Sequence, residues 1–351
     1  MSTPAASLLL CATLAVPAGA AVPSTATLRG VDVYRSETVT PDMVTRLLGQ
    51  KIALFVLRSN EGGTALKFAN QLKGELAADV SRLGDLAFVD MHVGRSIRAA
   101  AYDLVITFDL VDAKDRLARM PFAAPPVGRL PDPGGLLGQW RRYWELCAQA
   151  RSRGEPVSER PACPSFYCPW IERTDAIREL EELFVREVPS RQAELARVLS
   201  GDERAQDRAA AVYLLAFSTS APAVAERMLG ALADPDKEVR VAALSVLADL
   251  VVYGGEVAID VPRLLPALDY PTTEDRTKAL AVFAGLAVHP NYKTYVAGRA
   301  AVQIARLLRS RDPGVRGLAH SVLGMVSGRD YPDDDFESWE KWAREEAAAA
   351  R

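Results

Sequence analysis

The chain contains few of the residues and motifs from which active sites are usually built. Its 351 residues include three histidines, His92, His289 and His320, which lie far apart in the sequence. It has no glycine-rich phosphate loop with its lysine, no nucleophile elbow and no His-Glu-x-x-His motif. Because no pattern brings a nucleophile, a base and an orienting acid together, we predict a protein that is not an enzyme and has no cofactor.

The chain also lacks a surplus of positive charge and any long apolar run. It has 42 Lys and Arg against 45 Asp and Glu, which gives a formal net charge of -3, and the two signs are interspersed. A nucleic-acid-binding surface needs a basic patch, so we predict no nucleic-acid partner. No apolar run reaches the ~18 to 20 residues that a membrane span requires, so we predict no transmembrane span.

The N-terminus has the pattern of a secretory signal peptide, which we assign to residues 1–20. An apolar core over residues 8–16 is followed by Pro17 and by the small residues Ala18, Gly19 and Ala20. The basic start that such peptides usually have is missing, because no Lys or Arg precedes Arg29. We expect export to the periplasm or the cell envelope. The alternative is an alanine-rich N-terminal tail on a cytoplasmic protein.

Cysteine is scarce, and its use depends on export. If Cys11 leaves with the signal peptide, Cys147, Cys163 and Cys168 remain. Cys163 and Cys168 are the candidate disulfide, because they flank a short proline-containing loop and an exported chain can oxidise them. A bond from Cys147 to either one, or three thiols, are the alternatives, since spacing does not determine pairing. The spacing does not fit a zinc knuckle and no histidine lies nearby, so we predict no metal site.

Residues 21–118 predict a small α+β domain with the order strand, helix, helix, strand, strand. Apolar and polar residues alternate over residues 28–35, which is typical of a strand. Thr40 and Pro41 are a good helix start, and a second helix follows Gly62 and Gly63. Two further strands are expected over residues 87–91 and 104–110.

This order resembles a POTRA module, a small periplasmic domain of outer-membrane assembly and transport proteins. The resemblance rests on residues 30–34, 84–89 and 105–112 and covers about residues 27–116. It implies docking of a partner by strand addition at an exposed sheet edge. The barrel that follows such modules in transport proteins is not encoded here.

An alternative interpretation takes Ile52 to Leu57 as a buried strand, because this run is continuously apolar. It gives a thioredoxin-like domain, although no Cys-x-x-Cys motif is present for redox chemistry. A thiol-dependent function would then use Cys147, Cys163 or Cys168.

Residues 119–172 predict a linker. Residues 120–135 are rich in proline and glycine, which favours an extended and fairly stiff chain. Next comes a helix whose aromatic face, with Trp140, Tyr143, Trp144 and Cys147, is expected to pack on a neighbour. The two candidate disulfide cysteines close this segment.

Residues 173–351 contain a repeat that aligns on Arg208, Arg240, Arg276 and Arg316. Three residues after each arginine comes an alanine, and three and four residues later come two large apolar residues. Repetition at this period predicts stacked helical hairpins, each too small to bury its own apolar face. We therefore expect an all-α solenoid, with an entry helix that is broken at Pro189.

The repeats resemble HEAT repeats in the segments Asp234 to Arg240 and Asp312 to Arg316, and the match covers about residues 190–328. The resemblance implies a structural polar ladder between repeats. Its expected members are Asp202, Arg208, Asp234, Arg240, Arg276 and Arg316. The third repeat departs because Asp269 comes one residue early, and the fourth has Ser310 in the place of the acid, so we expect an incomplete ladder.

The chain ends in an acidic run, residues 333–335, followed by Trp339 and Trp342. We predict a helix capped by Asp334 and Glu337 that covers the last repeat, because the run lacks the alternation of a calcium loop.

These features predict an exported, non-enzymatic scaffold or adaptor that binds another protein through the HEAT-like solenoid, on the concave ridge of second helices. Besides the thiol-dependent alternative, the chain could be a regulatory subunit of another enzyme. The identity of the partner does not follow from the sequence.

Overall fold

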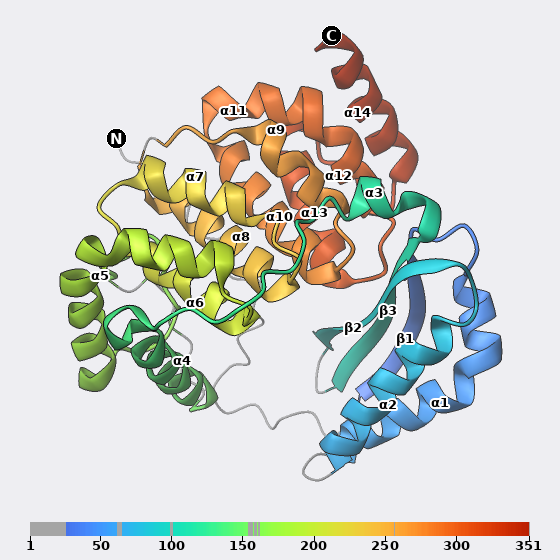
Figure 1. Ribbon diagram of the computed structural model, residues 1–351. Helices are drawn as coiled ribbons and strands as arrows, with labels where there is room; N and C mark the ends of the chain where they lie inside the picture. The colour runs from blue at the N-terminus through green and yellow to red at the C-terminus, as the bar shows by residue number, and fades with distance from the viewer. Residues whose placement is uncertain are drawn as a thin grey trace.

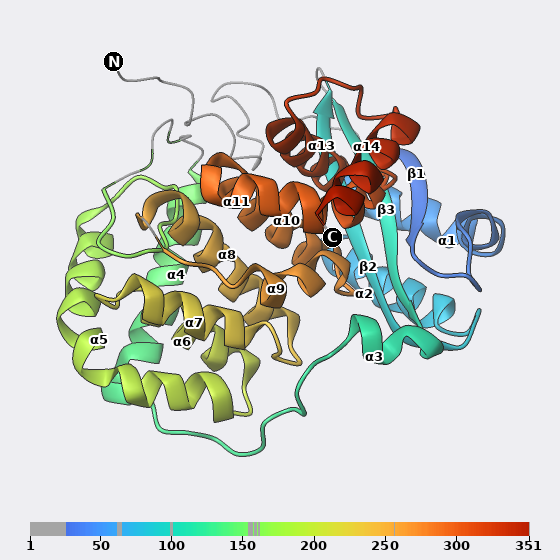
Figure 2. The same ribbon diagram turned by 90° about the horizontal axis from the view of Figure 1, so that it is seen from above.

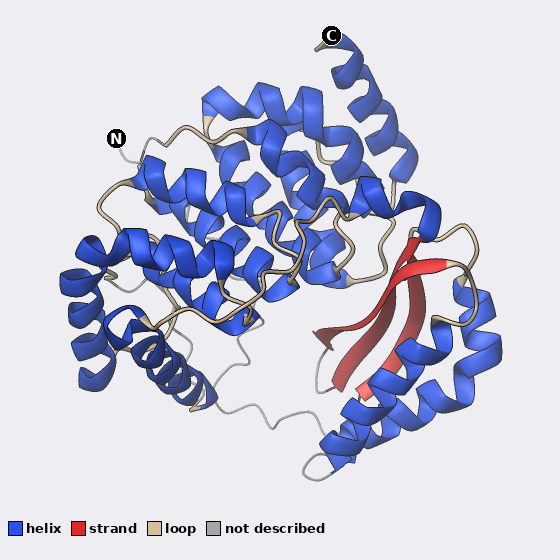
Figure 3. Cartoon of the chain, viewed as in Figure 1, coloured by secondary structure: helices blue, strands red, loops and turns tan. Residues whose placement is uncertain are grey.

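The computed structural model describes residues 26–61, 65–98, 101–153, 157, 160, 162–255 and 257–350. A small three-stranded sheet near the N-terminus is followed by a region that is mostly helical (Figures 1 and 3). The predicted signal peptide and the Gly62-Gly63 turn lie outside the described residues.

The first region contains β1 (Ala26–Tyr34), α1 (Pro41–Glu61), α2 (Ala65–Val80), β2 (Leu86–Arg98) and β3 (Ala101–Asp112). The sheet order is β1-β3-β2, with β1 parallel and β2 antiparallel to β3. Helix α1 packs against β1 and α2 against β2. The predicted order of strands and helices is therefore confirmed.

The core of this region lies between one face of the sheet and the two helices. Alternate residues of β3, namely Ile106, Phe108 and Leu110, are fully buried there together with Val44 and Leu76. The residues between them point to the other face, and Thr107 and Asp109 are buried as well. A polar and buried second face requires a partner that supplies hydrogen bonds.

The alternative strand at Ile52 to Leu57 is wrong, because α1 continues through it. Ile52 and Phe55 are buried, whereas Ala53 is exposed and Leu57 is 52% exposed. Burial that recurs every three residues fits one face of a helix and not the two-residue period of a strand.

The proline-rich segment is bound along its length to the helical region. After η1 (Ala113–Asp115) and α3 (Arg116–Arg119), the N–H of Ala123 donates to the carbonyl of Ala233. Further on, the carbonyl of Gly128 accepts from the N–H of Glu203, and the N–H of Leu130 donates to Asp202. These hydrogen bonds hold the segment against the helical region. Figure 2 shows its course from α3 along the edge of this region.

The helical region consists of η2 (Pro133–Gly135), α4 (Leu136–Ser152), α5 (Asp175–Gly201), α6 (Ala205–Leu215), α7 (Ala221–Ala231), α8 (Lys237–Tyr253), α9 (Val261–Leu264), η3 (Leu265–Asp269), α10 (Thr273–Val288), α11 (Pro290–Tyr295), η4 (Val296–Ala300), α12 (Ala301–Leu307), α13 (Pro313–Ser327) and α14 (Phe336–Ala349). Helices α6, α8, α10 and α13 pack side by side in chain order. These four helices carry the aligned arginines.

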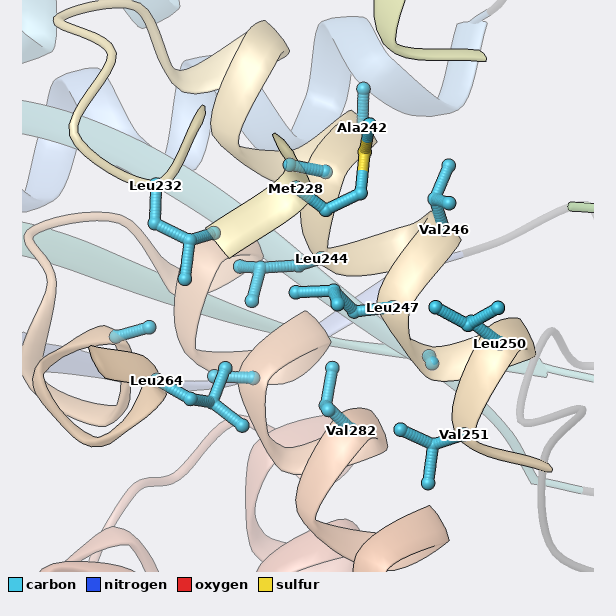
Figure 4. Packing of buried hydrophobic residues seen from close by; sticks show 14 of the residues in the cluster. Met228, Leu232, Ala242, Leu244, Val246, Leu247, Leu250, Val251, Leu264 and Val282 are labelled. Carbon is cyan, nitrogen blue, oxygen red and sulfur yellow. The ribbon is translucent and has the colours of Figure 1, made fainter. Parts of the chain in front are cut away.

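The alanine of each aligned segment lies in the contact between these helices. Ala211, Ala243, Ala279 and Ala319 are completely buried. A small side chain allows two helix backbones to approach closely, and the large residues that follow fill the space on either side. Figure 4 shows Leu244 and Leu247 of α8 between side chains of α7 and the labelled Leu264 and Val282.

Helix α5 is not broken at Pro189, so that prediction is wrong. The helix runs through Pro189, although proline removes one backbone hydrogen bond and costs about 3 kcal/mol in a helix interior. Buried residues continue on both sides of the proline, with Phe184 and Val188 before it and Leu195 after it. The burial of these apolar side chains on both sides of Pro189 offsets the lost backbone hydrogen bond.

The C-terminal helix α14 packs against α12 and places Trp339 and Trp342 in the core. Its N-cap is Asp335, whose side chain accepts from the N–H of Ser338, and not Asp334 as predicted. The acidic run therefore begins a helix.

Candidate functional site

Each aligned arginine binds the turn that precedes its own helix. The guanidinium groups of Arg208, Arg240 and Arg276 donate to the main-chain carbonyl six residues earlier, each at 2.9 Å. Arg316 donates to the carbonyl of Ser310, also six residues earlier, at 3.0 Å. The arginines thus satisfy carbonyl groups that the preceding turn leaves without a helical partner.

The other side of the guanidinium binds a carboxylate that lies in the first turn of the next aligned helix or just before that helix. Arg208 of α6 donates to both oxygens of Asp234 at 2.7 and 2.8 Å. Arg240 of α8 donates to both oxygens of Asp275, the third residue of α10, at 3.1 and 2.7 Å. Both pairs are buried and bidentate, the strongest geometry for this interaction. We call each such arginine–carboxylate pair a rung.

The structure therefore brings together only part of the predicted ladder. Arg208 donates to the main-chain carbonyl of Asp202 and not to its carboxylate. The carboxylate of Asp202 accepts from Arg204 and from the N–H of Leu130. Asp275 was missed because the repeat pattern pointed to an acid near Asp269. One feature of the sequence could have identified Asp275. An acid directly before the aligned arginine occurs twice, as Asp207-Arg208 and as Asp275-Arg276.

The rung of Arg276 is completed from outside the helical region. Its Nη2 donates to Asp109 of β3 at 2.6 Å, and both side chains are fully buried. Asp109 also accepts from the N–H of Thr273 at 2.6 Å and from its hydroxyl at 3.0 Å. The sheet thus supplies the carboxylate for Arg276, whereas the next aligned segment of the helical region supplies it for Arg208 and Arg240.

The other two strands also place an acid against the start of an aligned helix. Asp90 of β2 pairs with Lys237, the first residue of α8, at 2.6 Å. Asp32 of β1 accepts from the N–H of Arg311, just before α13, at 2.8 Å. A helix start carries partial positive charge and unpaired N–H groups, so acids are stabilised there. The polar face of the sheet therefore docks on the starts of α8, α10 and α13.

His92 lies between two carboxylates inside this interface. Its ring nitrogens lie 3.4 Å from Glu274 and 3.4 Å from Asp312. Burial lowers the pKa of His92, but the hydrogen bonds and charges of Asp312 and Glu274 outweigh it and raise the pKa to about 9. Burial raises the pKa of Glu274, yet the hydrogen bond and charge of His92 outweigh it and lower the pKa to about 2.

Several charged groups around a hollow of about 450 Å³ between β1 and α12 have ion-pair partners. Asp269 accepts from the hydroxyl of Tyr34 and forms an ion pair with Arg35. Arg309, on the same wall, pairs with Glu340. This arrangement stabilises the junction and does not resemble a nucleophile with its base.

The second helices do not present the open ridge that we expected at the N-terminal end of the stack. The N–H of Phe166 donates to the carbonyl of Ala216, and that of Cys168 donates to Asp249 of α8. Trp140 of α4 and Tyr167 both lie against the ring of Tyr213 on α6, with centroids 5.1 and 4.6 Å away. The chain's own segment therefore covers α6 and α8 at these positions.

In the described part of the chain, Cys147, Cys163 and Cys168 form no disulfide with one another. The sulfur of Cys163 donates to the carbonyl of Tyr167 at 3.4 Å, and Arg173 donates to the sulfur of Cys168 at 2.8 Å. Burial raises the pKa of Cys147 to about 11, and the charge of Arg173 acts in the opposite direction. The disulfide between Cys163 and Cys168 stays a prediction.

One edge of the sheet borders a hollow. β2 is an edge strand, and a hollow of about 320 Å³ lies between its first residues and α2. The lining residues are Ala77, Ala78, Ser81, Leu86, Ala87, Phe88 and Val89. The other edge is partly occupied, because Arg311 binds the carbonyl of Val31 and Asn60 binds both backbone groups of Ala26.

The three histidines are far apart and each has a structural partner. His289 bonds to the carbonyl of Val251 at 2.8 Å, and His320 to that of Tyr331 at 2.7 Å. In the described part of the chain, no three His, Cys, Asp or Glu side chains are grouped to hold a metal ion. None of the described helices is both long and apolar enough to cross a membrane.

No protein-family model matches the chain. A search of curated proteins found no match either.

Proposed function

We propose that this protein is an exported, non-enzymatic adaptor, in which a HEAT-like solenoid is the frame and a POTRA-like domain binds another protein. The observation that carries the proposal is the recurring rung. An arginine that binds the turn before its own helix and an acid at or just before the start of the next aligned helix is the kind of polar ladder that the HEAT resemblance implies. The series of rungs continues with the pair of Arg276 and Asp109, which joins the sheet to the helical region.

The edge of β2 is the surface that best suits a partner. One face of the sheet is covered by α1 and α2, and the other is docked on the helix starts. The edge of β1 is partly occupied by Arg311 and Asn60. An extended segment of another protein can add to β2 by main-chain hydrogen bonds, with small apolar side chains in the hollow beside Ala78.

The test blocks the hollow without disturbing the core. Ala78 is exposed on α2 and lines the hollow, whereas Ala53 is also exposed but lies on α1, the helix that covers β1. Ala78→Arg and Ala53→Arg therefore add the same side chain inside and outside the proposed surface. Each variant and the wild type is cross-linked in envelope fractions of the source organism, and the captured proteins are identified by mass spectrometry.

The proposal predicts a captured protein that is lost with Ala78→Arg and retained with Ala53→Arg. Equal capture by both variants places the binding surface elsewhere. If no protein is enriched in envelope fractions but one is in the cytoplasmic fraction, the export part of the proposal is wrong.

A further inference from the structure

The hollow between β1 and α12 has one wall from each region of the molecule. Tyr34 and Arg35, at the end of β1 and just after it, line one side, and Gln303 and Arg306 of α12 line the other. Its volume of about 450 Å³ is within the range of about 300–1,000 Å³ that is typical of small-molecule sites. Because neither region forms both walls, the hollow exists only while the sheet is docked on the helices.

Three arginines line this hollow, and two of them have an acidic partner. Arg35 pairs with Asp269, and Arg309 pairs with Glu340 at 2.7 Å. The third, Arg306, is exposed, and its side chain forms no ion pair or hydrogen bond within the described part of the chain. Its guanidinium therefore keeps its N–H donors for a molecule from solution.

The acids that line the hollow are already engaged by the protein. Asp269 pairs with Arg35 and also lies 3.6 Å from Arg119. Both oxygens of Asp32 accept backbone N–H groups, at 3.0 and 2.8 Å. One positive charge is in excess around the hollow, because four arginines stand against three acids, namely Arg35, Arg119, Arg306 and Arg309 against Asp32, Asp269 and Glu340. An anion is therefore favoured there over a cation.

Two polar side chains lie on the same wall as Arg306. The hydroxyl oxygen of Ser310 accepts from the N–H of Asp312 at 3.1 Å, and its own hydrogen has no acceptor among the described residues. Gln303 lies three residues before Arg306 and thus on the same face of α12. Its Oε1 is buried and has no hydrogen-bond partner in the described part of the chain. The wall thus offers donors to an anionic group and an amide to a polar group beside it.

We propose that this hollow binds a small organic anion, whose phosphate or carboxylate group lies on Arg306 and Ser310. A guanidinium suits either group, because its N–H donors form a planar fork that matches two oxygens. The rest of the molecule lies against the remaining wall, which includes Val33, Tyr34 and Leu268. A molecule bound here contacts both regions, so it also stabilises their docking.

The inference goes beyond the adaptor proposal and does not depend on it. The hollow lies beside β1, whereas the proposed protein-binding edge is β2, and β3 separates these two strands in the sheet. Ala78→Arg should therefore abolish capture of a partner without changing the affinity for the anion. Failure of one proposal leaves the other standing.

The first experiment is calorimetric titration of the full-length protein with phenyl phosphate and with benzoate at low salt. These two probes carry the same ring on a phosphate and on a carboxylate, and phenol carries the ring without the charge at pH 7. We expect one molecule of phenyl phosphate or benzoate to bind per chain, at least about 10-fold more tightly than phenol. The tighter of the two probes identifies the anionic group. If neither gives saturable binding below about 10 mM, the proposal is overturned.

A matched pair of variants places the anionic group. Arg306→Ala removes the arginine that lines the hollow without an acidic partner. Arg197→Ala removes an arginine of α5 that is also exposed and has no ion pair among the described residues, but does not line the hollow. We expect Arg306→Ala to weaken binding at least about 10-fold, Arg306→Lys to weaken it less, and Arg197→Ala to leave it unchanged. Equal affinities in Arg306→Ala and Arg197→Ala contradict the assignment.

Thermal melting then tests whether the bound anion stabilises the docked form. A saturating concentration of the tighter probe should raise the melting temperature of the wild type and of Arg197→Ala by at least about 2 °C. The same concentration should leave Arg306→Ala unchanged. A rise of equal size in Arg306→Ala places the anion elsewhere and overturns the proposal.

Discussion

The rung between Asp109 and Arg276 is the contact whose loss should change the molecule most. Asp109→Asn keeps the size of the side chain and removes its charge. Arg276 is 1% exposed, so water cannot replace the lost carboxylate, and its remaining hydrogen-bond acceptors are the carbonyls of Tyr270 and Pro271 and the hydroxyl of Thr273. Leaving one charge of a buried pair without its partner costs about 3–5 kcal/mol.

The assay is urea unfolding followed by two probes. All five tryptophans lie in the helical region or its linker, whereas circular dichroism reports on the whole chain. We expect Asp109→Asn to lower the free energy of unfolding by about 3–5 kcal/mol. We also expect an early transition in circular dichroism that tryptophan fluorescence does not report, because the sheet undocks before the helices unfold.

The control is Glu226→Gln, which breaks the exposed pair in which Nη1 of Arg263 lies 2.7 Å from both oxygens of Glu226. Surface pairs of this kind contribute about 0–1 kcal/mol. If Asp109→Asn is no more destabilising than Glu226→Gln, the sheet is not held by this rung and the reasoning is refuted.

Three further predictions concern the packing and the interface. Ala243→Asp places an unpaired charge in the contact between α8 and its neighbours, where Ala243 is fully buried. It should lower the free energy of unfolding by several kcal/mol, and thermal melting within a degree or two of wild type would show that the repeat register is wrong. Trp339→Ala should cost about 3–5 kcal/mol in urea unfolding, because this ring is completely buried beside Trp342 and its N–H binds the carbonyl of Pro332; a cost below about 1 kcal/mol would mean that α14 does not cap the stack. His92 has its pKa raised from 6.5 to about 9, so its contribution is fully present below pH 6.5 and is lost as the pH rises through about 9. The free energy of unfolding, measured in urea from pH 5 to 10, should therefore fall more in the wild type than in His92→Gln, by a difference on the order of 3 kcal/mol, and parallel curves would exclude His92 as the cause.

The order of elements and the repeat register were predictable, because both rest on local periodicity. Alternation over β1 and β3 and the alanine at a fixed distance from each arginine were sufficient for that purpose. The continuous apolar run from Ile52 to Leu57 was ambiguous, since periodicity alone does not separate a buried strand from a helix. Pro189 was misjudged because its cost is local, while the burial that offsets it spans the whole of α5.

The partners across the two regions were not predictable from this one sequence. Asp109 and Arg276 are separated by 167 positions in the chain, and nothing in either segment identifies the other. The alternation of β3 does indicate that Asp109 lies on the polar face of the strand, but not that this face is buried. The covering of α6 and α8 by Phe166 to Cys168 was missed for the same reason, because a loop without periodicity gives no indication of where it packs.

The most direct test of stacking by arginine–carboxylate rungs is the coupling energy between Arg240 and Asp275. Arg240→Met, Asp275→Asn and the double variant, each unfolded in urea, give this energy as a double-mutant cycle. The two side chains are 2% and 0% exposed and joined at 2.7 Å, so we predict a coupling of about 2 kcal/mol or more. Additive effects within about 0.5 kcal/mol would mean that these helices do not meet through the rung, and the account of the helical region would be contradicted.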